Sequence, residues 1–211
     1  MCFMYPLFYN LLKYFKRNIV IRWGEAKLIS KKKEEHHALD DDDRRSPGPS
    51  IDFIFKSMIY NNVEFAVGEV SGAPLVQNQT HFMGDRNKIA KNLKTMIKSI
   101  INLKKHIIES RVQNIQIYGI QIYVIVYRMM YVQGLYAFMK VDNFSIPHLP
   151  ATYKDQLPDF ISNMWKLKNL ILESHQSIAN YLSLSNTSDG TETPLSNLSS
   201  PYVSPTKRQK R

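Results

Sequence analysis

Two acidic residues, Asp52 and Glu69, lie on two segments whose residue types predict neighbouring β-strands. Residues 51–58 and 63–70 are rich in β-branched and aromatic side chains, and they flank the dipeptide Asn61-Asn62. Asparagine tolerates the positive φ angles of a tight turn, so the two segments are expected to pair as an antiparallel hairpin.

This hairpin places the two carboxylates on one face of the sheet. A turn centred on the two asparagines makes Asp52 and Glu69 diagonal neighbours, whereas a turn shifted by one residue places them directly opposite each other. In both registers the side chains lie roughly 5–8 Å apart. Phe65 and Val67 are expected on the same face, where a lone charge is costly.

Paired carboxylates on an apolar surface suit a hard cation such as Mg²⁺ or Mn²⁺, which prefers carboxylate oxygens and water. Asp52 and Glu69 are therefore candidate metal ligands. The alternative is that Asp52 begins one strand and Glu69 ends another, both at the surface and without a shared role.

Composition indicates a globular protein with an anionic partner. The 211 residues are 44% hydrophobic and 22% charged, which allows one domain with a core plus tails. The formal net charge is +10, so nucleic acid is the expected partner. Cys2 is the only cysteine, which excludes an intramolecular disulfide and a cysteine-based zinc site.

Residues 1–29 are expected to contribute an N-terminal helix to the domain. Residues 1–12 are apolar but too short to span a bilayer, and no positive charge precedes them. We therefore expect no membrane association and a nuclear or cytoplasmic location, with a signal sequence as the alternative. Apolar residues at helical spacing predict a helix over residues 7–22, and residues 19–25 either continue it or form a short strand.

Two segments with little hydrophobic periodicity flank a predicted α/β core at residues 51–182. Residues 30–50 contain runs of lysine, glutamate and aspartate and the sequence Pro47-Gly48-Pro49, which is typical of a disordered loop. Residues 183–211 are rich in serine, threonine and asparagine and end in a basic cluster, so a disordered tail is expected. The cluster suits a nuclear import signal or a nucleic-acid contact, or simply favours solubility.

A strongly basic helix is predicted over residues 86–109, with Asp85 as its N-cap. Its buried stripe comprises Ile89, Leu93, Met96, Ile97, Ile100 and Ile107. Its other faces carry Arg86, Lys88, Lys91, Lys94, Lys98, Lys104 and Lys105. These charges either contact an anionic partner or are solvated. Strands are then expected from residue 115 to 131 and from 135 to 141, with a hairpin at Gly134 and a final helix over 153–182.

This order of elements resembles the core of the restriction-endonuclease-like, or PD-(D/E)XK, nuclease superfamily. It also resembles a group of uncharacterised fungal proteins that carry such a pattern. The resemblance covers roughly residues 19–180 without the loop at 30–50, and it implies a mixed α/β sheet flanked by helices. The matching segments are Trp23-Gly24-Glu25, Ile51-Asp52-Phe53, Gly68-Glu69-Val70-Ser71-Gly72, Asp85-Arg86-Asn87-Lys88-Ile89 and Gly134-Leu135-Tyr136.

The resemblance implies hydrolysis of a phosphodiester in DNA or RNA with the help of Mg²⁺ or Mn²⁺. Asp52 and Glu69 correspond to the metal ligands, and Glu25 corresponds to an extra acid often found on the first helix. Ser71 stands where the motif has a lysine, and a serine supplies no cation.

Some members of the superfamily carry that lysine on the following helix, where Lys88 or Lys91 would take its place. If neither reaches the carboxylates, the protein is a nucleic-acid-binding or regulatory module without catalysis. A third hypothesis is a protein-interaction domain whose positive charge is unrelated to nucleic acid. Gln116 and Tyr118 either line the same cleft or only support the sheet.

Overall fold

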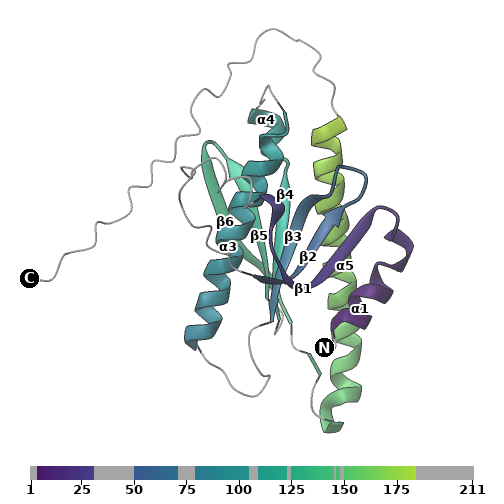
Figure 1. The fold of residues 1–211 in the computed structure, drawn as a ribbon. Coiled ribbons are helices and arrows are strands. Elements are labelled where there is room, and N and C mark those ends of the chain that lie inside the picture. The colour runs from purple at the N-terminus through teal and green to yellow at the C-terminus, as the bar shows by residue number, and fades with distance from the viewer. Residues whose placement is uncertain are drawn as a thin grey trace, which may run out of the picture.

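A mixed six-stranded sheet lies at the centre of the computed structural model (Figure 1). The structure describes residues 4–30, 50–70, 79–104, 109–122, 125–144, 146–147 and 150–183. The predicted disordered segments therefore lie almost wholly outside the described residues, as do Ser71 and Ile107.

The strands follow one another across the sheet in chain order. They are β1 (Ile19–Ala26), β2 (Ile51–Ser57), β3 (Val63–Val70), β4 (Gln116–Ile122), β5 (Ile125–Val132) and β6 (Leu135–Asn143). Strands β3 and β4 are parallel, and every other neighbouring pair is antiparallel. The predicted α/β class, a mixed sheet flanked by helices, is confirmed.

Helix α3 (Gln79–Ile101) covers one face of the sheet and supplies the crossover that the parallel pair β3–β4 requires. It contacts β3, β4 and β5, and the short helix α4 (Glu109–Val112) leads from it into β4. Its buried residues include Ile89, Leu93, Met96, Ile97 and Ile100, as predicted.

The opposite face is covered by helix α5 (Tyr153–Ser183), which matches the predicted final helix and contacts β3 and β4 (Figure 1). A single 3₁₀ turn, η2 (Pro150–Thr152), leads into it. Helix α1 (Met4–Leu11) contacts α5 and places the buried ring of Phe8 against Phe53 and Phe55. Among the described helices, none is both long enough and apolar enough to cross a membrane.

The β2–β3 connection contains the predicted turn at Asn61-Asn62, but the strands have the register that was predicted for a shifted turn. Asn61 and Asn62 both have positive φ, at 49° and 59°, and Val63 donates its N–H to the Tyr60 carbonyl at 3.0 Å. The last pair of the ladder is Ser57 and Val63, so residues 58–62 connect the strands and this turn is the final part of that connection. Phe53 pairs with Gly68, so the register places Asp52 opposite Glu69.

Phe65 does not share a face with Glu69, and this part of the prediction is wrong. The register of β2 and β3 shifts between Phe55 and Lys56, as a β-bulge does, and the extra residue on β3 is Phe65. Its ring therefore lies 5.5 Å from that of His175 on α5. Val67 remains on the face covered by α3.

The N-terminal segment is not one helix over residues 7–22. Helix α1 ends at Leu11, a 3₁₀ turn η1 (Lys13–Phe15) follows, and β1 begins at Ile19. The β-branched residues at the start of β1 favour extended backbone, and pairing with β2 satisfies their backbone groups. Residues 1–29 thus contribute a strand to the same sheet as well as a helix.

The basic helix begins and ends earlier than predicted. It starts at Gln79, so Asp85 lies within the helix and is not its N-cap. No proline separates Gln79 from Asp85, and Gly84 is an exposed helical residue. At the other end, Leu103 donates its N–H to the Ile100 carbonyl, which tightens the last turn and stops the helix well before residue 109.

Candidate functional site

Asp52 and Glu69 lie side by side on the sheet face that α3 covers. Asp52 is half-buried on β2, and its Oδ2 accepts a hydrogen bond from the backbone N–H of Val70 at 2.7 Å. Glu69 is 4% exposed on β3. The hydrogen bond ties the first carboxylate to the strand that carries the second, so the hairpin itself fixes their relative position.

Lys88 of α3 approaches this pair from above the sheet. Its Nζ lies 2.8 Å from Oε1 of Glu69, and its side chain is 27% exposed. Lys91 is exposed, and no ion pair joins it to either carboxylate within the described residues. Of the two candidate lysines, the structure therefore brings Lys88 to the site.

Burial raises the pKa of the Glu69 carboxyl from 4.5 to about 7. The Lys88 ammonium opposes this shift, whereas the negative charges of Asp52 and Asp85 add to it. The main cause of the raised pKa is loss of hydration under α3, and repulsion by Asp52 is a smaller contribution.

Glu69 is held in place from the opposite face by an aromatic row. Trp23, Phe53 and Gly68 pair across β1, β2 and β3. The rings of Trp23 and Phe53 lie 4.6 Å apart, and a Cβ at Gly68 would lie 1.8 Å from the ζ carbon of Phe53. Only glycine fits beneath this ring.

Gln121 of β4 is a neighbour of the site that the sequence analysis missed. It pairs with Glu69 in the parallel register and is 1% exposed. Its Nε2 donates to the Phe82 carbonyl at 2.8 Å, and its Oε1 accepts from the Tyr127 hydroxyl at 3.1 Å. The sequence feature that could have indicated Gln121 is a polar glutamine between two isoleucines on a buried strand.

Gln116 and Tyr118 do not line the same cleft as Glu69. Side chains alternate along β4, so these two residues face α5, whereas Gln121 faces α3. The Tyr118 hydroxyl donates to Gln116 Oε1 at 3.1 Å, and Ser174 of α5 donates to the Gln116 carbonyl at 2.7 Å. Their contacts support the packing of α5 on the sheet.

Glu25 lies on strand β1 and not on a helix, contrary to the resemblance. It is exposed, and it lies where the β1–β2 register is interrupted between Trp23 and Ala26. Within the described ranges, no cluster of three or more histidine, cysteine, aspartate or glutamate side chains is arranged to hold a metal ion. The candidate metal ligands are therefore Asp52 and Glu69 alone, and Ser71 is not described.

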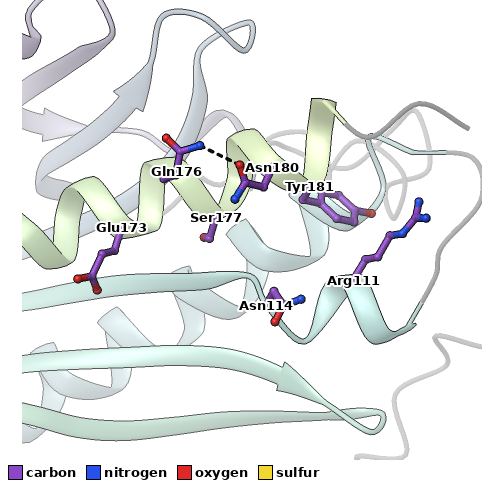
Figure 2. A pocket seen from close by; sticks show the side chains of 7 residues that line it. All are labelled: Arg111, Asn114, Glu173, Gln176, Ser177, Asn180 and Tyr181. Carbon is purple, nitrogen blue, oxygen red and sulfur yellow. Dashed lines mark hydrogen bonds between the residues drawn. The ribbon is translucent and has the colours of Figure 1, made fainter.

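Two hollows lie away from these carboxylates. One, of about 360 Å³, lies between the end of α5 and the start of β4. Figure 2 shows its polar lining, in which Gln176 donates to Asn180 at 2.8 Å. The other, of about 410 Å³, lies at the β2–β3 turn beside Glu64. The lining of neither hollow includes Asp52, Glu69 or Lys88.

A second buried ion pair, between Lys56 and Glu64, is structural. Their charged atoms lie 3.2 Å apart, and Glu64 also accepts hydrogen bonds from the backbone N–H groups of Ile29 and Ser30 and from the Ser30 hydroxyl. Both oxygens of Glu64 are thus engaged within the protein. Of the two buried glutamates in the part of the chain that the structure describes, Glu69 is therefore the one available for chemistry.

Comparison of the chain with protein-family models, with curated proteins and with solved structures gives no match. Two carboxylates can bind a hard cation, and one ammonium beside them can neutralise an anionic ligand. A phosphate group can bind such a cation and the ammonium at the same time.

Proposed function

We propose that the chain is a metal-dependent nuclease-like protein with a restriction-endonuclease-like core, which hydrolyses phosphodiesters of DNA or RNA. The distance of 2.8 Å between Lys88 Nζ and Glu69 Oε1 is the observation that carries the proposal. It supports the hypothesis that the helix after the hairpin supplies the lysine that the motif would have at Ser71.

Asp52 and Glu69 fit a magnesium or manganese ion by their donor chemistry. Mg²⁺ is commonly bound through one or two carboxylates, while water and substrate phosphate complete its shell. Two carboxylates on adjacent strands are therefore sufficient, and a third acid from Glu25 is not needed. When bound, the ion supplies an activated water and offsets the charge that develops on phosphorus.

The protein's own groups have separate roles in this proposal. The hydrogen bond from Val70 holds the Asp52 carboxylate in position, and the aromatic row beneath Gly68 holds the strand that carries Glu69. Lys88 offers three donors on one cation, which can bind a phosphate oxygen or orient the attacking water. Glu69 must be ionised to act as a ligand, so activity should rise with pH through about 7.

Cleavage of labelled DNA and RNA, single- and double-stranded, tests the proposal. With Mg²⁺ or Mn²⁺ the parent should cleave one of these substrates, and EDTA should abolish cleavage. Glu69→Gln and Lys88→Ala should each lower the rate by about 100-fold or more, as loss of a charge-stabilising group does. Lys91→Ala removes an equal charge from the same helix and should retain the parental rate. A parent inert with both ions, or a Glu69→Gln variant as active as the parent, would contradict the proposal.

A second candidate function is nucleic-acid binding without catalysis. It is favoured by the same ion pair, because Lys88 already compensates Glu69 when no cation is bound. This module would bind nucleic acid with a steep dependence on salt, as phosphate contacts release counterions, and would not cut it. Salt-dependent binding of an intact substrate by the parent in Mn²⁺ would identify this second function.

A further inference from the structure

A row of cations and aromatic rings runs beside the candidate site, where α3 borders strands β5 and β6. We define this basic–aromatic track as Arg86, Lys94, Tyr127, Tyr136 and Phe138. The three rings lie on the sheet face that α3 covers, because Tyr127 pairs with Gly119 and Phe138 pairs with Met129 in the registers of β4 to β6. Helix α3 contacts β5, and β6 forms the edge of the sheet beyond it.

The cations of the track lie over its rings. The Arg86 guanidinium is 5.9 Å from the ring centroids of both Tyr127 and Phe138, and these two rings stack at 4.9 Å. Lys94 Nζ lies 5.1 Å from the centroid of Tyr136. Arg86 and Lys94 are exposed, and Tyr136 and Phe138 are half-buried. Tyr127 is only 2% exposed, so the accessible part of the track comprises the two cations and the exposed portions of Tyr136 and Phe138, along one side of α3.

One hydrogen bond connects the track to the strand neighbour of Glu69. The Tyr127 hydroxyl donates to Gln121, which is the β4 neighbour of Glu69. Helix α3 also carries five basic residues, Arg86, Lys88, Lys91, Lys94 and Lys98, against one acid, Asp85. A polyanion bound to the track would thus lead directly to the ammonium and carboxylates of the site.

We propose that the basic–aromatic track binds single-stranded nucleic acid and delivers it to the candidate site. Alternation of cations and aromatic rings suits a single strand, whose phosphates bind the cations while its unpaired bases stack on the rings. A duplex keeps its bases stacked internally, so these bases are not free to stack on the rings. Arg86 and Lys94 give up cation–π contacts on binding, but a stacked base contributes more than a cation over an exposed ring.

The inference rests on the proposed function in one respect, that the substrate is a nucleic acid. The choice of strand type is new, and it depends on residues other than Asp52, Glu69 and Lys88. Binding can therefore be measured in EDTA, where no cleavage occurs, so that the two proposals fail independently.

A matched control surface lies on the far side of the sheet. On α5, Trp165 is 58% exposed and carries the Lys168 ammonium 3.7 Å from its ring centroid, so it is also an accessible cation–aromatic pair. It faces away from Glu69, because α5 covers the opposite face of the sheet. Lys166, also exposed on α5, is a charge control for Lys94.

The test is fluorescence anisotropy of a labelled oligothymidylate and of a labelled duplex, with the full chain in EDTA at fixed salt. The parent should bind the single strand at least about 10-fold more tightly than the duplex. The double variant Tyr136→Leu/Phe138→Leu retains apolar side chains but loses the aromatic faces, and it should weaken single-strand binding by about 10-fold or more. Lys94→Ala, which leaves the sheet intact, should weaken it and lower the salt slope. Trp165→Leu and Lys166→Ala should bind as the parent does.

Tighter binding of the duplex, or loss of binding in Trp165→Leu with parental binding in Lys94→Ala, would overturn the inference. If polyglutamate displaced the labelled oligonucleotide as well as the unlabelled oligonucleotide does at the same charge concentration, the inference would also be overturned. That result would indicate an acidic protein partner. Parental single-strand binding by the track variants, together with cleavage lost in Glu69→Gln, would reject the track and leave the proposed function standing. Track-dependent binding without cleavage would support the track and reject the proposed function.

Discussion

The Nζ atom of Lys88 on α3 lies 2.8 Å from Oε1 of Glu69 on β3. This contact joins a helix to the buried strand on which it packs. In the motif, the lysine stands two residues after the glutamate and therefore on the same face of the strand. Lys88 brings its ammonium to the Glu69 carboxylate from the helix above the strand, which is the role that the proposed function assigns to the motif lysine.

Removing this ammonium should change the titration of the carboxyl beside it. Lys88 lowers the pKa of Glu69 against the larger effect of burial, so Lys88→Ala should raise that pKa above about 7. Carboxyl-detected NMR across a pH series measures it directly. Lys91→Ala, with its charge in solvent, should leave the titration at its parental midpoint, and an equal shift in both variants would refute the assignment.

The stability of the fold should depend on pH through Glu69. The pKa of Glu69 is about 7 in the folded chain, against an ordinary value of 4.5. Between these two pH values the folded chain keeps a proton on Glu69 that the unfolded chain has released. Stability is therefore lost as pH rises from about 4.5 to 7, by up to about 3 kcal/mol. Glu69→Gln should lose this dependence, being more stable than the parent at about pH 8 and similar at about pH 4. Urea unfolding of both proteins at the two pH values provides the comparison, and parallel pH curves would count against it.

Gly68 should resist substitution although it lies in a regular strand. An added Cβ at this position would meet the Phe53 ring at 1.8 Å, and Trp23 limits the movement of that ring. Gly68→Ala should therefore lower stability by about 1–3 kcal/mol, the range for an overpacked core. Gly84→Ala is the control, because the space around this helical glycine is open, and it should stabilise α3 by about 0.5–1 kcal/mol. Thermal unfolding measures both, and a neutral Gly68→Ala would contradict the packing argument.

Local patterns were sufficient to predict the hairpin, the buried stripe of α3 and the extent of α5. In each case the signal is contained in the segment itself: Asn61-Asn62 specifies the turn, and apolar spacing specifies the helix faces. The side of the strand on which Glu69 lies followed from the same alternation.

The remaining features depend on contacts between segments far apart in the chain. The β-bulge that turns Phe65 toward α5 and the pairing of β1 with β2 are decided by neighbouring strands. Gln121 reaches Glu69 because β3 and β4 are parallel, which no residue in either strand specifies. The choice of Lys88 over Lys91 depends on the rotation of α3 about its axis, and a buried stripe defines that rotation only once the sheet beneath it is known.

A cation at Asp52 and Glu69 should stabilise the fold through mass action. An ion that binds the folded chain alone adds about 2.7 kcal/mol at a hundredfold excess over Kd. Asp52→Asn and Glu69→Gln each relieve the repulsion between the two carboxyls, so without metal each variant should unfold no earlier than the parent. Each also removes a ligand charge, so each should lose the thermal shift that Mn²⁺ gives the parent.

Isothermal titration calorimetry of the folded chain with Mn²⁺ at about pH 8, where Glu69 is ionised, tests the central claim most directly. The account predicts saturable binding of the ion to the parent and to Lys91→Ala, and loss of that binding in Asp52→Asn and Glu69→Gln. Absence of binding to the folded parent at millimolar Mn²⁺ or Mg²⁺, or undiminished binding to Glu69→Gln, would contradict it.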